Sequence, residues 1–167
     1  IKSEKILVLL DCCHSGGFAT SADVPMNERD KNEFLGKPNR VIISASHAKE
    51  YSYASTPLSI FTYALVEGLA GKFFEDGDKE VTLFNLAMYL RERVYPLSEH
   101  TQRPQLNIVK NAATTDFGIV RYPNGKPKDA IFTSAFILKD GSGKGIEDKP
   151  VERDEEYRQQ FNWIMTI

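Results

Sequence analysis

The stretch from Lys5 to Gly17, with the sequence KILVLLDCCHSGG, constrains the fold of this chain more than any other part of it. Its apolar run, Ile6 to Leu10, is typical of a strand that is buried on both faces of a parallel sheet. An acid, two thiols, an imidazole and two glycines are placed within the seven residues that follow. Ligand crevices of open α/β sheets lie beyond the carboxyl ends of the strands. This order of residues therefore indicates an active site at the end of the strand.

Strand and helix signals follow one another along the rest of the chain, which predicts an α/β fold. The composition changes after Tyr122, so we expect one domain over residues 1–122 and an extension, or the start of another domain, over residues 123–167. The second part contains a candidate amphipathic helix at 154–167. The other expected elements are a short helix at 27–35, a strand at 41–43, a helix from Ser59 to Leu69, a helix from Thr82 to Pro96, and strands at 105–109 and 117–120, the last closing the sheet.

Composition narrows the classes of partner. The formal net charge of the 167 residues is −2, so no overall basic field is present to attract nucleic acid or membrane headgroups. No apolar run approaches the ~20 residues of a membrane-spanning helix. The two cysteines are adjacent and cannot form a disulfide framework, which favours a reducing compartment and hence the cytoplasm.

Strand alternation divides the reactive stretch. Asp11 and Cys13 are expected on one side of the chain, while Cys12 points to the other side and packs into the core. Gly16 and Gly17 would let a substrate backbone approach and would aim backbone N–H groups at a developing oxyanion. A thiol nucleophile beside an oxyanion site indicates acyl transfer, that is, peptide cleavage through a thioester.

Other interpretations of these residues stay open on residue types alone. Cys12 and Cys13 could be buried structural thiols, or a thiol redox sensor. A metal site built from Cys12, Cys13 and His14 is disfavoured, because adjacent side chains splay apart. The acidic turn from Glu75 to Glu80 lacks the twelve-residue calcium loop and is expected to be a solvated turn.

The segment Asp11 to Gly16, DCCHSG, resembles the D-x-C-H-S-G signature around the catalytic cysteine of metacaspases and orthocaspases, which are caspase-like cysteine peptidases. The resemblance covers roughly residues 1–122 and implies a mostly parallel caspase-hemoglobinase-like sheet flanked by helices. Further segments that resemble the bacterial members are Val41 to Ser46, Phe61 to Leu65 with Glu67 to Leu69, Arg103 to Leu106, and Asp116 with Phe117.

The resemblance implies that Cys13 is the nucleophile, with its own N–H in the oxyanion hole, and that Asp11 is an acid in the S1 pocket that selects Arg or Lys at P1. A carboxylate paired with a basic substrate side chain is a physically sensible selector. The implied pocket wall consists of Ser44, Ala45, Ser46, Tyr51 and Tyr53. The implied substrate is a polypeptide with a basic P1 residue, and autoprocessing at basic residues is a further implication.

The family's general base, a His in an S/G-H-G motif, has no match here, since His14, His47 and His100 all lie in other contexts. We therefore expect the base on a segment upstream of Ile1 or on a separate chain. No cofactor is expected; calcium is possible by the resemblance, although the sequence offers no site for it. The alternative, from a different class, is a catalytically inactive caspase-like scaffold or interaction module.

Overall fold

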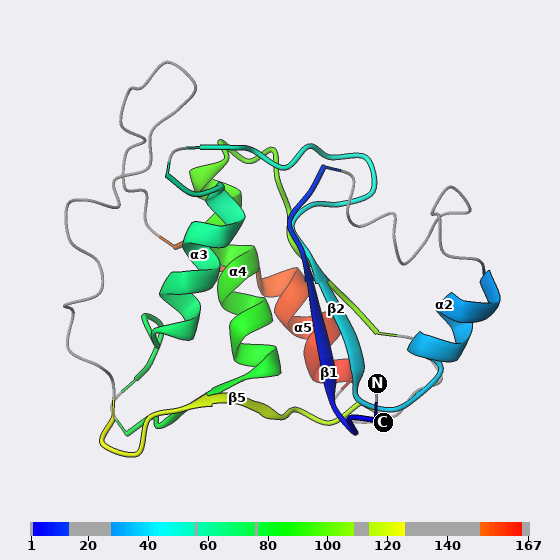
Figure 1. Cartoon of the computed structure of the whole chain (residues 1–167). Helices are drawn as coiled ribbons and strands as arrows, with labels where there is room; N and C mark the ends of the chain where they lie inside the picture. Colours follow the sequence, from blue (N-terminus) through cyan, green and yellow to red (C-terminus); the bar gives the residue numbers. More distant parts are fainter. Residues whose placement is uncertain are drawn as a thin grey trace.

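The computed structural model describes residues 2–13, 28–55, 57–75, 77–108, 114–125 and 151–164, and Figure 1 shows their arrangement. Three strands form the main sheet: β1 (Ile6–Leu10), β2 (Arg40–Ser44) and β4 (Gln105–Asn107). The middle strand β2 runs parallel to β1 and antiparallel to β4. The mixed α/β fold that the sequence predicts is confirmed.

Two helices cover one face of this sheet (Figure 1). They are α3 (Ile60–Leu69) and α4 (Leu83–Leu97), and each begins at the expected cap. Ser59 accepts a hydrogen bond from the Thr62 amide at 2.9 Å, which satisfies one of the unpaired N–H groups at the start of α3. The helices pack on Val41 and Ile43 of β2 and on Ala45, one residue beyond its end, which are alternate residues on one face of the sheet. The apolar side chains on this face of the sheet therefore decide which face α3 and α4 cover.

Strand β1 is confirmed, but its expected burial on both faces is wrong for the described part of the chain. Leu7 packs against the core, whereas the side chain of Leu9 is 38% exposed. The reason is that β1 lies at the edge of the sheet and pairs only with β2 among the described strands. Leu7 and Leu9 lie on the same face of the sheet as Val41 and Ile43, which are their direct partners in the parallel register.

A second, two-stranded sheet corrects another expectation. Strand β5 (Gly118–Arg121) does not close the main sheet; it pairs antiparallel with β3 (Glu80–Thr82), with Val81 opposite Val120. No strand was expected at β3, whose residues fall between the acidic turn and the Thr82 cap. So short a segment carries no periodic signal, and its pairing depends on a strand almost 40 residues away.

Two further helices agree with expectation: α2 (Glu28–Leu35) and α5 (Glu155–Ile164). Residues 151–158 lie against the first part of the chain. Arg158 donates to the Glu92 carboxylate of α4 at 2.6 Å, and the Tyr157 hydroxyl accepts from the Leu106 amide of β4 at 3.1 Å. The domain boundary near Tyr122 stays a prediction, but residues on its two sides are bonded to each other.

Pro96 does not end α4 but lies in its last turn, one residue before the helix ends. Proline has no N–H, so the carbonyl of Glu92, four residues earlier, loses its usual helical partner. The amide of Glu152 donates to this carbonyl at 3.1 Å. A main-chain group from the C-terminal segment thus completes the bonding of α4.

No helix in the described ranges is long and apolar enough to cross a membrane.

Candidate active site

Asp11 and Cys13 follow β1 and meet at one residue of the neighbouring loop, Ser52. The Ser52 hydroxyl donates to Oδ1 of Asp11 at 3.0 Å, and the Cys13 thiol donates to the Ser52 carbonyl at 3.6 Å. Both Asp11 and Cys13 are exposed. The two side chains therefore reach the same loop, as the alternation of β1 predicts, and both are open to a substrate.

The carboxylate of Asp11 lies at the N-terminus of α3. Its Oδ2 accepts hydrogen bonds from the hydroxyls of Ser59 and Thr62, the latter at 2.6 Å. Ser59 is the cap of this helix, so the negative charge faces the positive end of the helix dipole. With Ser52, three hydroxyl groups now hold one carboxylate.

The directions of these hydroxyl groups are set by their other partners. Ser59 accepts from the Thr62 amide, and Ser52 accepts from Nε2 of Gln102 at 3.5 Å. A hydroxyl that accepts from one side donates its single hydrogen to another. These bonds therefore direct the hydrogens of Ser52 and Ser59 at Asp11.

Gln102 is fully buried and holds the loop through its side-chain amide. Its Nε2 also donates to the Ala45 carbonyl at 2.9 Å, and its Oε1 accepts from the Tyr53 amide at 2.9 Å. Both ends of the amide group are thus used, as a buried polar side chain requires. Through these bonds Gln102 fastens the loop at 52–53 to the end of β2.

Glu50 provides a second attachment for the same loop. Its carboxylate accepts from the Arg103 amide at 2.7 Å, from Nη1 of Arg103 at 2.7 Å and from the His47 amide at 3.3 Å. The Arg103 guanidinium lies over the Tyr95 ring, 4.5 Å from its centre, and donates to the Tyr95 hydroxyl. The hydrogen bond to Glu50 is the main cause that raises the pKa of Arg103 above its ordinary value.

The five residues expected in the pocket wall fall into two groups. Ser44, Ala45 and Ser46 are buried behind the site: the Asn107 side chain donates to Ser44 at 3.2 Å, and Ser46 donates to the Cys12 carbonyl at 3.5 Å. Tyr51 and Tyr53 are exposed on the loop. The strand-end residues support the cysteine segment from behind, whereas the two tyrosines lie at the surface. Their role in substrate binding stays a prediction.

Cys12 corrects one expectation at this site. Its side chain is exposed and does not pack into the core. It lies two residues beyond the end of β1, outside the paired part of the sheet. The expected oxyanion residues Gly16 and Gly17, together with His14, lie outside the described residues.

The sequence interpretation missed the residues that surround Asp11. Ser52, Thr62 and Gln102 were not singled out, and Ser59 was expected only as a helix cap. One signal could have identified Ser59 and Thr62: a capped helix that follows the second strand of a parallel pair starts near the edge of the sheet where the strands end. Ser52 and Gln102 offer no such signal, because their positions depend on the path of a loop.

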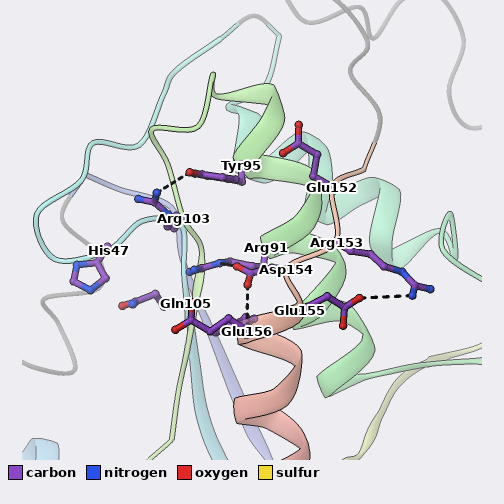
Figure 2. Close-up of a pocket in the computed structure, with 11 residues that line it drawn as sticks. His47, Arg91, Tyr95, Arg103, Gln105, Glu152, Arg153, Asp154, Glu155 and Glu156 are labelled. Atoms are coloured by element: carbon purple, nitrogen blue, oxygen red, sulfur yellow. Dashed lines mark hydrogen bonds and ion pairs between the residues drawn. The ribbon is translucent and has the colours of Figure 1, made fainter.

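The histidines of the described part have other surroundings. His100 pairs with Glu152, with Nε2 2.9 Å from the carboxylate. His47 lines a cavity of about 530 Å³ between the C-terminal half of α4, β4 and the start of α5 (Figure 2). Figure 2 shows Arg91 and Arg103 from the first part of the chain and Asp154 to Glu156 from the second around this cavity. Charges of both signs line it.

Metal binding finds no support in the residues described. No group of three or more His, Cys, Asp or Glu side chains there could hold a metal ion. In the acidic turn, Asp78 accepts from the Glu75 amide at 2.9 Å, and this carboxylate thus stabilises the turn itself. The described residues therefore do not fit a calcium site, and no step of the chemistry is assigned to one.

In a comparison with protein families, the model of the caspase domain (Peptidase_C14) matches residues 1–115. No curated protein and no solved structure matches the chain significantly.

Proposed function

Since this chain belongs to the caspase family of cysteine peptidases, we propose that it carries the nucleophile and the P1-binding acid of a metacaspase-type endopeptidase that cleaves after Arg or Lys. The observation that carries the proposal is the meeting of Asp11 and Cys13 at Ser52. If the side chain of the P1 residue bonds Asp11, the carbonyl carbon of that P1 residue would lie near the Cys13 sulfur, because Asp11 and Cys13 are both held by Ser52.

In this proposal the Cys13 sulfur, as thiolate, attacks the scissile carbonyl carbon and forms a thioester, and the leaving amine takes up a proton. Water then hydrolyses the thioester. The backbone N–H groups of Cys13, Gly16 and Gly17 are proposed to bind the oxyanion. We propose that the general base is a histidine outside the described residues, supplied by an upstream segment or a separate chain, because His100 is paired with Glu152 and His47 lines the other cavity.

The bonding of Asp11 bears on the form of P1 recognition. A carboxylate offers about four acceptor sites, two on each oxygen. Ser59 and Thr62 occupy Oδ2, and Ser52 occupies one site of Oδ1. With respect to the described residues, one site is left on Oδ1, and it suits a single N–H donor, from either a lysine ammonium or one arm of an arginine guanidinium. We therefore propose that Arg and Lys are accepted with similar efficiency, without two-point bonding of the guanidinium.

The proposed partner is a polypeptide with a basic P1 residue, and autoprocessing at such residues follows from the same pocket. Nucleic acid and membranes are not proposed partners, in keeping with the net charge of −2. Two unpaired, exposed cysteines fit a cytoplasmic location, where thiols stay reduced.

The test is turnover of fluorogenic peptides ending in Arg or Lys by the full-length protein. Cys13→Ala abolishes turnover, whereas Cys12→Ala, at the adjacent exposed cysteine, retains it. Asp11→Asn removes the preference for basic P1 residues. Turnover that survives Cys13→Ala rules out the assigned nucleophile. A full-length wild type that cleaves no Arg or Lys peptide leaves the inactive caspase-like scaffold as the function.

A further inference from the structure

Ser52 has two different connections to the candidate active site. Its side chain is bonded to the acid Asp11, and its main chain is bonded to the nucleophile Cys13. The other two hydroxyl donors to Asp11 are Ser59, which caps α3, and Thr62, which lies in its first turn. Their bonds to Asp11 are the connection that the structure gives them to this site. Ser52 therefore differs from Ser59 and Thr62, because it contacts the nucleophile as well as the Asp11 carboxylate.

Ser52 is itself held from behind. Gln102, which is 0% exposed, donates to the Ser52 hydroxyl and accepts from the next amide of the loop, that of Tyr53. The same side chain donates to the Ala45 carbonyl, one residue beyond β2. Gln102 thus ties Ser52 to the central strand β2, which pairs with β1, the strand that Asp11 and Cys13 follow.

We propose that Ser52 is a positioning residue that fixes the distance between the P1-binding acid and the attacking sulfur. This inference rests on the proposed function and adds a residue to it. Ser52 contacts both the acid that binds the P1 side chain and the thiol that attacks. It therefore keeps the bound substrate and the Cys13 sulfur at a constant distance from each other. A residue that only stabilised the acid would affect substrate binding alone, whereas Ser52 affects binding and the chemical step.

Kinetics of the full-length peptidase on an Arg peptide separate these two roles. Ser52→Ala removes a hydrogen bond to a charged group, and we expect a loss in kcat/KM of roughly tenfold to a hundredfold, with KM raised and kcat lowered. Thr62→Val also removes a hydroxyl from Asp11, at nearly unchanged volume, and raises KM with kcat retained. Ser55→Ala is the control: its hydroxyl bonds the Leu58 carbonyl in the same loop, and its kinetics stay at the wild-type values.

A second measurement does not depend on peptidase activity. The rate of Cys13 alkylation by iodoacetamide is followed by mass spectrometry in a Cys12→Ala background. Ser52→Ala removes the hydroxyl that bonds residue 52 to Asp11 and Gln102, so the main chain of residue 52 is held less firmly and its carbonyl releases the Cys13 thiol. We expect alkylation to be about fivefold faster, which is the factor that one neutral hydrogen bond is worth. Thr62→Val and Ser55→Ala leave the rate unchanged.

Wild-type alkylation of Cys13 in the Ser52→Ala protein overturns the positioning role, whatever the kinetics show. So does a Ser52→Ala protein whose only kinetic change is the KM change of Thr62→Val. If the wild type cleaves no Arg or Lys peptide, the proposed function fails, and the alkylation rates alone decide whether Ser52 positions the thiol.

Discussion

The carboxylate of Glu67 on α3 and the guanidinium of Arg93 on α4 lie 2.7 Å apart, with side-chain exposures of only 2% and 6%. Tyr89 donates to the same carboxylate at 2.9 Å, and the Arg93 guanidinium lies over the Tyr63 ring. This ion pair joins the two helices that form one wall of the core. A buried charge that loses its partner is costly, because neither water nor a counter-charge replaces the lost interaction.

Glu67→Gln is therefore expected to lower the free energy of unfolding by about 3 to 5 kcal/mol, since it removes the negative charge that pairs with the buried Arg93 guanidinium. Glu80→Gln is the matched control, because it removes the carboxylate that pairs with Arg121, a side chain that is largely exposed. That change is expected to cost less than about 1 kcal/mol. Urea denaturation of both variants measures the difference. Equal losses would contradict the importance assigned to burial of the Glu67 pair.

The same cluster predicts a dependence of stability on alkaline pH. Burial, followed by the charge of Glu67 and the hydrogen bond to it, raises the pKa of Tyr89 above its ordinary value. A raised folded-state pKa means that the stabilisation is complete below the unfolded-state pKa, near 10, and is lost as the pH rises beyond it. The free energy of unfolding then falls by up to about 1.4 kcal/mol per pH unit above pH ~10.

Tyr89→Phe removes this proton from both states, so its stability falls less steeply than that of the wild type above pH ~10. Denaturation curves recorded between pH 8 and pH 11 give the two slopes. The offset at pH 8 reports the lost hydrogen bond to Glu67 and is read separately. Identical slopes in the two proteins would show that Tyr89 is not the group that titrates.

The loop that carries Ser52 offers a prediction for amide exchange. Glu50→Ala removes the carboxylate that accepts from the His47 and Arg103 amides, and exchange of these two amides is expected to speed roughly tenfold. The Tyr53 amide, which donates to Gln102, is an internal control and keeps its rate. Equal acceleration at Tyr53 would mean that the two attachments of the loop do not act separately.

The attachment of the C-terminal segment is tested through Arg158. Its guanidinium bonds the Glu92 carboxylate, which is almost fully buried and also accepts from the Asp154 amide at 3.1 Å. Arg158→Met is expected to speed exchange of the Asp154 and Tyr157 amides roughly tenfold, while the amides of β2 keep their rates. Arg153→Met is the matched control, since Arg153 is largely exposed and its ion pair within the described residues is the 3.8 Å contact with Glu155. Similar rates in the two variants would argue against a specific role of Glu92.

Local signals predicted much of the fold. The caps at Ser59 and Thr82 placed the starts of α3 and α4 correctly, because a cap is a bond between residues three positions apart. The alternation of β1 likewise placed Asp11 and Cys13 toward the same partner, Ser52. These features depend on a few neighbouring residues, and a sequence displays them directly.

Features set by distant contacts could not be predicted in this way. The pairing of β3 with β5, and the exposure of Leu9 and Cys12, depend on which segments cover a strand. The hydroxyl groups around Asp11 come from residues 41 to 51 positions further along the chain. Their convergence requires the packing of α3 on the sheet, which the order of residues does not specify.

The bond from the Glu152 amide to the carbonyl that Pro96 leaves open has a consequence for the order of folding. The Glu92 carbonyl takes up its final direction only once α4 is formed around it. We therefore expect the segment at 151–154 to attach late, after α4 has folded onto the sheet. Because the contact is between main-chain groups, any residue except proline at position 152 preserves it. Pulsed hydrogen exchange during refolding tests this order: protection of the Glu152 amide that precedes protection of the α4 amides would reverse it.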